Sequence, residues 1–142
     1  MMIVEPTSDS DFRRYYDLRW RILRAPWDQP RGSERDDQDA DATHLMVVND
    51  SETLGVGRLH IKPGSSACIR YMAVDEQYRG SGIGSLILAE LENRAVAQGV
   101  KRIILNARET AVGFYEKHGY RALGPAPTLF GCIAHVEMSK TP

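Results

Sequence analysis

Apolar runs bounded by turn residues fill the middle of the chain. Three of them, at residues 44–49, 54–61 and 67–74, are separated by Asn-Asp-Ser and Lys-Pro-Gly-Ser-Ser. Short turns of this chemistry join antiparallel strands, so these runs predict an antiparallel meander. Other apolar runs predict further strands at residues 2–5, 102–106, 120–123 and 132–138.

Helical periodicity occupies three segments between the strands. A first helix, capped by a serine near residue 8, repeats its apolar positions every three to four residues until Pro26 ends it. A second helix is predicted over residues 83–99, and a short third helix over residues 110–118, closed by Gly119.

The segment between the first helix and the meander, residues 25–41, is polar, dense in charge and interrupted by prolines. Long connections inside a compact domain often cover a functional site, and a mobile solvated loop is the alternative. Trp27 favours a lid, because a large aromatic side chain in so polar a segment needs a surface to pack against.

Composition is ordinary for one soluble globular domain over residues 1–142, with 42% hydrophobic and 26% charged residues. The net charge of −1 indicates no nucleic-acid partner. No apolar run predicts a membrane span or a signal peptide, so a cytoplasmic location is expected. Cys68 and Cys132 lack metal-ligand spacing, so no metal site is predicted, and both are expected to be buried free thiols.

Residues 74–84, Val-Asp-Glu-Gln-Tyr-Arg-Gly-Ser-Gly-Ile-Gly, join a predicted strand to a predicted helix. The first N–H groups of a helix have no intrahelical partner, and the helix dipole adds partial positive charge there. Glycine lets an anion approach these N–H groups closely, and Arg79 adds a full positive charge. The segment therefore predicts a phosphate site built largely from main chain.

Three other interpretations explain this turn less well. A P-loop needs Lys-Ser/Thr after its last glycine, whereas Ser85 and Leu86 follow here. A dinucleotide fingerprint needs the spacing G-x-G-x-x-G at the start of a βαβ unit, whereas the spacing here is G-x-G-x-G. A connection without a ligand explains the glycines but not Gln77 and Arg79 beside them.

The pattern Q-x-x-G-x-G at residues 77–82, extended as R-G-x-G-I-G over residues 79–84, resembles the acyl-CoA-binding motif of the GNAT superfamily of N-acyltransferases. Residues 111–120, Ala-Val-Gly-Phe-Tyr-Glu-Lys-His-Gly-Tyr, resemble a later motif of that family. The two motifs stand in family order, and the resemblance covers residues 45–139. The pattern I-x-H-x-x-M at residues 133–138 is similar to the ending of some ElaA-like members.

The resemblance implies an α/β (α+β) fold. Its sheet would be mixed and mostly antiparallel, with six to seven strands, about four flanking helices and central strands splayed at the acyl-CoA site. The expected organisation of the single domain is a helix and lid at 8–44, antiparallel strands at 45–75, the pyrophosphate turn and its helix at 76–99, and C-terminal strands with a short helix at 100–142.

The implied cofactor is acetyl-CoA, whose pantetheine arm would pair with the backbone before the glycine-rich turn. Many relatives carry asparagine at the position of Arg108, so the usual amide contact is in question, and Asn106 is an alternative supplier. The cofactor-binding residues expected from the resemblance are Met72, Ala73, Val74, Arg79, Gly80, Ser81, Gly82, Ile83, Gly84, Asn106 and Arg108.

Tyr115 falls at the tyrosine of the later motif and is the expected catalytic proton donor, because a phenol stays protonated at neutral pH. A core aromatic is its alternative role. The general base is open: the strand before the turn carries Arg70 where many relatives have glutamate. Water, His135, Glu137 or no base at all remain as alternatives.

The resemblance implies an N-acetyltransferase that acts by direct attack in a ternary complex on a small-molecule or peptide amine. Arginines around the first helix favour a carboxylate-bearing amine, although solvated charges explain them equally well. A catalytically silent acyl-CoA-binding module is the alternative function.

The expected partners exclude nucleic acid and membrane and include a second copy of the chain. The substrate-binding candidates are Arg24, Trp27 and His135.

Overall fold

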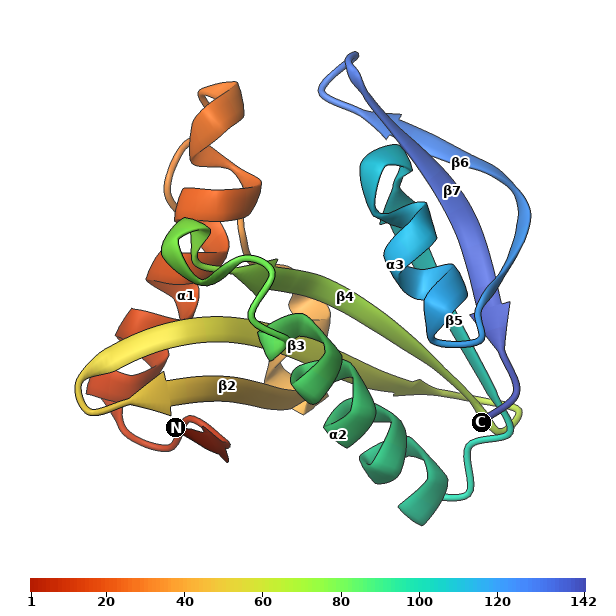
Figure 1. Cartoon of the computed structure of the whole chain (residues 1–142), viewed down its shortest axis with the longest axis horizontal. Helices are drawn as coiled ribbons and strands as arrows, with labels where there is room; N and C mark the ends of the chain where they lie inside the picture. The colour runs from red at the N-terminus through yellow and green to blue at the C-terminus, as the bar shows by residue number, and fades with distance from the viewer.

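Seven strands form one mixed sheet in the order β1-β2-β3-β4-β5-β7-β6 (Figure 1). The computed structural model describes all of residues 1–142. Neighbouring strands are antiparallel except β4 and β5, which are parallel. The strands are β1 Met2–Val4, β2 Thr43–Asn49, β3 Glu52–Lys62, β4 Ser66–Val74, β5 Arg102–Arg108, β6 Arg121–Leu129 and β7 Ile133–Lys140.

Helices cover both faces of this sheet, with α1 on one face of β2–β4 and α2 on the other. The chain has three α-helices, one fewer than the expected count of about four, because the lid segment contributes only 3₁₀ turns. No helix combines the length and apolarity that crossing a membrane requires. The helices are α1 Asp9–Leu23, α2 Ile83–Ala97 and α3 Val112–Lys117, with 3₁₀ helices η1 Ala25–Trp27, η2 Asp37–Asp41, η3 Glu76–Tyr78 and η4 Glu109–Ala111.

The two parallel strands at the centre of the sheet separate soon after they meet. β4 and β5 pair only at Ser66–Arg102, Ala67–Ile103 and Cys68–Ile104. Further along, Figure 1 shows β4 and β5 diverging, so the sheet opens into two arms. The predicted mixed sheet with splayed central strands is confirmed.

A bulge in β4 lies just beyond the last of these pairs. Tyr71 and Met72 together oppose Gly57 of β3, and Tyr71 has a left-handed φ of 58°. A bulge bends its strand and increases its twist, which turns β4 away from β5. A tyrosine in this conformation costs about 1–3 kcal/mol, so surrounding contacts must hold it there.

The close approach of α2 to β3 depends on two glycines that face the helix. A Cβ at Gly55 would lie 2.7 Å from Ile83, and one at Gly57 would lie 2.8 Å from Ile87. Both distances are shorter than van der Waals contact, so a side chain at either position would push α2 away. The start of α2, which carries the glycine-rich turn, is positioned by this packing.

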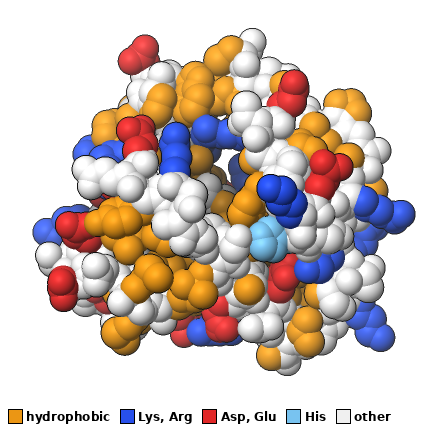
Figure 2. All heavy atoms as spheres, viewed as in Figure 1, with side chains coloured by type: hydrophobic (Ala, Val, Ile, Leu, Met, Phe, Trp, Pro, Cys, Tyr) orange, Lys and Arg blue, Asp and Glu red, His pale blue; other side chains and the backbone are white.

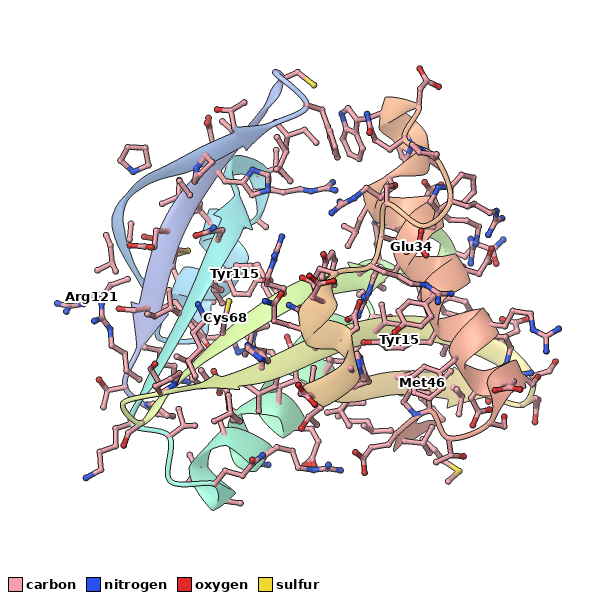
Figure 3. The ribbon with its side chains drawn as sticks, turned by 180° about the vertical axis from the view of Figure 1, so that it is seen from behind. Tyr15, Glu34, Met46, Cys68, Tyr115 and Arg121 are labelled. Atoms are coloured by element: carbon pink, nitrogen blue, oxygen red, sulfur yellow. The ribbon has the colours of Figure 1, made fainter.

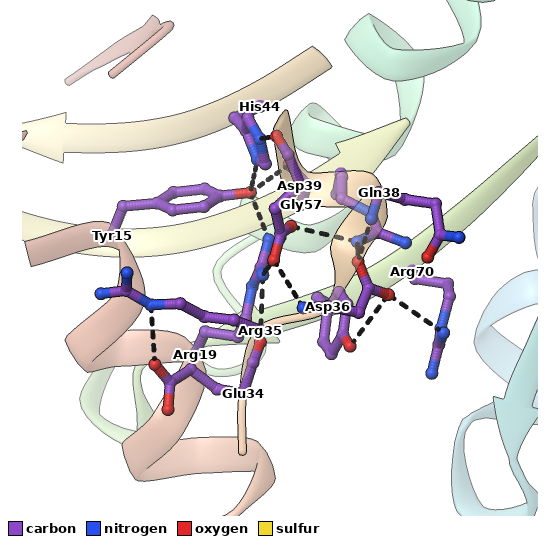
Figure 4. A network of polar contacts seen from close by, with 12 residues as sticks. Tyr15, Arg19, Glu34, Arg35, Asp36, Gln38, Asp39, His44, Gly57 and Arg70 are labelled. Atoms are coloured by element: carbon purple, nitrogen blue, oxygen red, sulfur yellow. Dashed lines mark hydrogen bonds and ion pairs between the residues drawn. The ribbon is translucent and has the colours of Figure 1, made fainter. Parts of the chain in front are cut away.

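A buried polar network fastens η2 to α1 and the sheet (Figure 4). Arg19, which is fully buried on α1, donates hydrogen bonds to the carboxylate of Asp39 at 3.0 Å and the hydroxyl of Tyr15 at 2.8 Å. Arg58 of β3 donates to the same carboxylate at 3.0 Å. The Tyr15 hydroxyl lies 2.7 Å from Nδ1 of His44. Residues 25–41 are therefore packed against the sheet by charged contacts.

These contacts keep Asp39 ionised. Burial alone would raise the pKa of its carboxyl, but the charge of Arg19 and hydrogen bonds from the Asp36 backbone, Arg19 and Arg58 lower the pKa below its usual range. A buried charge of this kind is tolerated only when it is paired and hydrogen-bonded.

The C-terminal strands differ from the sequence prediction at one place. Residues 124–127, Gly-Pro-Ala-Pro, were expected to connect two strands, but they continue β6 as far as Leu129. β6 lies at the edge of the sheet, where a proline does not have to donate to a neighbouring strand. The predicted strand at residues 120–123 was therefore too short.

Replacing Arg19 with methionine should destabilise the fold by about 3 kcal/mol, because Asp39 would lose one of its two buried cationic partners. Arg14→Met is the matched control, since Arg14 lies on the same helix in an exposed pair with Asp11 and such pairs contribute little. Urea unfolding of both variants checks this expectation. Equal unfolding midpoints for the two variants would show that the network is not what stabilises this region.

Candidate active site

The diverging strands enclose a cavity of about 670 Å³. Figure 2 shows the hollow in the middle of this face, with Lys and Arg side chains around its mouth. Its walls come from β4, β5, the end of α1 and the C-terminal hairpin. Among the predicted site residues, those that line it are Arg24, Met72, Ala73, Val74, Arg79, Asn106, Arg108, Tyr115 and His135.

One wall of the cavity is the free edge of β4. Residues 72–74 lie beyond the last β4–β5 pair, so no strand pairs with their edge on the β5 side. Their side chains pack against the core, as Ala73 does with the α1 cluster and Met72 with the α2 cluster. An extended ligand with amide groups can therefore pair with this edge as an additional strand would.

The glycine-rich turn lies beside this edge at the start of α2. Gly80 and Gly82 have left-handed φ values of 79° and 86°, and a Cβ at either would meet no atom within 4 Å. Their amide N–H groups have no backbone acceptor. α2 also lacks a side-chain cap and any acid in its first turn, whereas α1 is capped by Ser8. The turn therefore offers open N–H donors that fit a phosphate group.

The other predicted residues of the turn have local roles. The Ile83 side chain is buried in the core, and a Cβ at Gly84 would contact Phe114 of α3 at 3.4 Å. The Ser81 hydroxyl donates to the carbonyl of Tyr78. The Ser81 N–H donates to the same carbonyl, whereas the N–H groups of Ile83 and Gly84 begin α2 and have no intrahelical partner. Arg79 reaches the cavity with its side chain.

Tyr115 of α3 and Cys68 of β4, both labelled in Figure 3, line the cavity. The ring of Tyr115 is held by edge contacts with Phe114 and Tyr120, at centroid distances of 5.0 and 5.7 Å. Burial raises the pKa of Tyr115 to about 12. Its hydroxyl makes no hydrogen bond within the protein, so a protonated phenol faces the cavity.

His135 lies on β7 directly opposite Arg108 of β5. Its Nδ1 is 2.9 Å from the carbonyl oxygen of Ile133, and Nε2 makes no hydrogen bond within the protein. A proton on Nδ1 that is donated to this carbonyl leaves Nε2 as the acceptor. Glu137 does not line the cavity, so of the two acid–base candidates from the sequence only His135 is placed there.

Trp27, a predicted substrate-binding residue, does not line the cavity but contacts a residue that does. Its ring stacks on Phe130 of the β6–β7 turn, with centroids 6.4 Å apart, and the guanidinium carbon of Arg108 lies 4.5 Å from its centroid. Phe130 could not be identified from the sequence, because a lone aromatic residue in a turn carries no information about what it contacts.

Several cavity residues were also missed, namely Arg58, His60 and Lys62 of β3 and Cys68 of β4. They alternate with core residues along ordinary strands, and no local motif marks them. Cys68 is partly buried, but Cys132 is exposed in the turn before β7, so the expectation that both are buried is wrong for Cys132. Burial raises the pKa of the Cys68 thiol, which disfavours a reactive thiolate.

A family model described as the acetyltransferase (GNAT) family matches residues 12–120. The protein named "Uncharacterized N-acetyltransferase YjcF" of Bacillus subtilis (strain 168) is 30% identical over 140 residues, which cover 99% of both chains. YitI of the same organism, likewise named an uncharacterized N-acetyltransferase, is 28% identical over 132 residues and 89% of both chains.

Solved structures share the fold at lower identity. An aminoglycoside 6'-N-acetyltransferase complexed with coenzyme A has a TM-score of 0.83 at 19% identity, covering 99% of this chain and 97% of that one. Escherichia coli ElaA has a TM-score of 0.83 at 17% identity, covering 98% and 97%.

Gly82→Glu should weaken CoA binding by about 10-fold or more, because a negative side chain would occupy a turn that offers N–H donors and positive charge. Gly99→Glu is the matched control at the other end of α2, where φ is 80° and a Cβ also meets nothing within 4 Å. Calorimetric titration with CoA gives both affinities. Equal CoA affinity in the two folded variants would remove the phosphate assignment from the turn.

Proposed function

The chain belongs to the GNAT acetyltransferase family, and on that premise we propose that it transfers the acetyl group of acetyl-CoA to a primary amine of a small molecule or peptide by direct attack. The family is one of N-acetyltransferases that use acetyl-CoA. The observation that supports the specific proposal is the cavity between β4 and β5, which is lined by a free strand edge, by Arg79 of the glycine-rich turn and by a protonated tyrosine.

Three groups of residues would hold the cofactor. The N–H groups of residues 80 and 82–84 and the Arg79 side chain suit its pyrophosphate, and the free edge of residues 72–74 suits its pantetheine arm. When bound, acetyl-CoA supplies the acetyl group as a thioester. Asn106 lines the cavity and provides a further amide.

Tyr115 is proposed as the proton donor to the departing thiolate. Its raised pKa keeps the hydroxyl protonated throughout the neutral range. Since no protein group accepts its proton, the hydroxyl is free to donate into the cavity. A protonated phenol that is free to donate into the cavity can act as a general acid.

His135 is proposed as the base that accepts a proton from the amine. Its Nδ1 is occupied by the Ile133 carbonyl, so Nε2 is the atom available for the proton. The strand arrangement of β5 and β7 holds the ring in the wall of the cavity.

The two proposed acid–base roles predict different pH dependences of kcat for two variants. Tyr115→Phe should lower kcat about 100-fold or more at all pH values with little change in CoA affinity. His135→Gln should lower kcat by a similar factor near neutral pH and recover as the pH rises, because more of the amine is then unprotonated. The measurement is the pH profile of acetyl-CoA turnover with an amine panel.

Tyr120→Phe is the matched control, since Tyr120 neighbours Tyr115 but donates its hydrogen bond to Glu92 at 2.8 Å. It should reduce stability and leave kcat unchanged. Full turnover by Tyr115→Phe would return that residue to a packing role. CoA binding without turnover of any amine by the wild-type protein would favour a silent acyl-CoA-binding module.

Direct transfer predicts that neither cysteine carries the acetyl group. The Cys68 thiol has a raised pKa, and exposed Cys132 lies in a turn outside the cavity lining. The double variant Cys68→Ala/Cys132→Ala should retain activity and show intersecting double-reciprocal plots. Parallel plots together with an acetyl adduct on a cysteine in intact-mass spectra would establish an acyl-enzyme instead.

A further inference from the structure

The lining of the cavity is strongly cationic, although the whole chain has a net charge of −1. No aspartate or glutamate side chain lines it. The positive charge is therefore a local feature of this site. The cationic lining residues are Arg24, Arg58, Lys62, Arg70, Arg79 and Arg108.

Two of these positive charges are paired with a carboxylate of the protein. Arg58 and Arg70 both contact the carboxylate of Asp36, which holds η2 in place. Arg79 belongs to the phosphate turn. Lys62, Arg24 and Arg108 form no ion pair, so their charges remain for whatever enters the cavity.

Arg24 is buried, with 8% of its surface exposed, at the end of α1. Its Nε donates to the carbonyl of Ser33 at 3.0 Å, and its Nη1 donates to the carbonyl of Leu23 at 2.9 Å. These bonds fix the guanidinium without neutralising it. Burial lowers the pKa of Arg24, because loss of solvent disfavours the charged form of its guanidinium group.

Arg108 faces Arg24 from the other arm of the sheet. Leu105 and Ala107 of β5 are buried in the core with α2, so alternation places Arg108 on the opposite face, towards Trp27 of the lid. Its guanidinium makes no hydrogen bond or ion pair. Burial, and then the charges of Arg24 and Arg79, lower the pKa of Arg108.

Aromatic rings cover both guanidinium groups. Phe130 lies over Arg24 at 5.4 Å, and Trp27 lies over Arg108 at 4.5 Å. Phe130 adopts a left-handed φ of 52° in a two-residue turn with Gly131, a position that usually takes Asn, Asp or Gly. Strained residues of this kind concentrate at ligand clamps. The stacked rings connect residues 25–41 to the C-terminal hairpin, and each ring lies over one of the two guanidinium groups.

We propose that Arg24 and Arg108, beneath Trp27 and Phe130, bind an anionic group of the acceptor, which is therefore a small amine that carries a carboxylate or a phosphate. This inference rests on the proposed function. Two guanidinium groups without protein anions suit such oxygens, because Arg108 can donate paired, charge-assisted hydrogen bonds and Arg24 keeps its Nη2 donors free. Cationic amines are disfavoured by the same charges, including aminoglycosides, despite the fold shared with an aminoglycoside acetyltransferase.

The test compares amines that differ only in the anion. Amino acids are assayed against their carboxamides, and O-phosphoethanolamine against ethanolamine, which separates carboxylate from phosphate. The anionic member of the preferred pair should have at least a 10-fold higher kcat/KM. A carboxamide lowers the pKa of the neighbouring amine and makes it a more available nucleophile, so chemistry alone favours the opposite order.

Substitutions test which residues produce the preference for an anionic amine. Arg24→Gln and Arg108→Gln should each lower kcat/KM for the anionic member by about 10- to 100-fold, mainly through KM, and should lower it less for the neutral member, so that the ratio between the two members falls at least several-fold. Arg108→Glu should prefer spermidine to the anionic amine. Arg31→Gln is the control, because Arg31 lies in the same lid segment, pairs with Asp17 and does not line the cavity.

Equal kcat/KM within each pair, or a wild-type preference for spermidine or kanamycin, would overturn the anionic acceptor while leaving acetyl transfer established. If no amine is acetylated, the proposed function fails and the anion site is decided by binding alone. Succinate and inorganic phosphate are then titrated calorimetrically into CoA-saturated protein. Binding that Arg108→Gln weakens at least 10-fold supports the site, and no binding by folded wild-type protein overturns it.

Discussion

The left-handed backbone of Tyr71 is the constraint on which the other features of the molecule depend. It forms the bulge that bends β4 away from β5, so the sheet opens after three residue pairs. The ring is held between guanidinium groups, with Arg19 at 4.1 Å and Arg58 at 4.8 Å from its centroid. Those same arginines bind the lid through Asp39. The divergence of β4 from β5 and the packing of residues 25–41 against the sheet therefore both involve Tyr71.

The cavity has two sides that are built in different ways. On the α2 side, backbone groups of β4 and the glycine-rich turn form the proposed cofactor site, which needs few side chains beyond Arg79. On the α1 side, Arg24, Arg108 and the two aromatic rings form the proposed acceptor site from side chains of distant segments. Backbone recognition tolerates change in neighbouring side chains, whereas the acceptor side can change its preference by single substitutions. A shared family fold therefore need not imply a shared acceptor.

Local sequence determined most of the strands and helices and the conformation of the glycine-rich turn. Apolar runs bounded by turn residues define β2, β3 and β4, and helical spacing ended by Gly99 defines α2, because buried strands and half-buried helices require these patterns. The glycines at 80 and 82 indicate backbone that only glycine adopts without strain, and both have positive φ. The motif around Tyr115 placed that residue in the site. The boundary of β6 was predicted too short, because edge position, which permits its prolines, is not a local property.

Tertiary structure alone decided which charged residues face the cavity and which are neutralised. The sequence shows several arginines around α1, but only folding pairs Arg19 with Asp39, pairs Arg31 with Asp17 and leaves Arg24 without an anion. It also brings Phe130 onto Trp27, across more than a hundred residues of chain. These outcomes depend on contacts between segments far apart in sequence. Local periodicity and motif spacing carry no information about them, because the free energy of a charge is set by its neighbours in space.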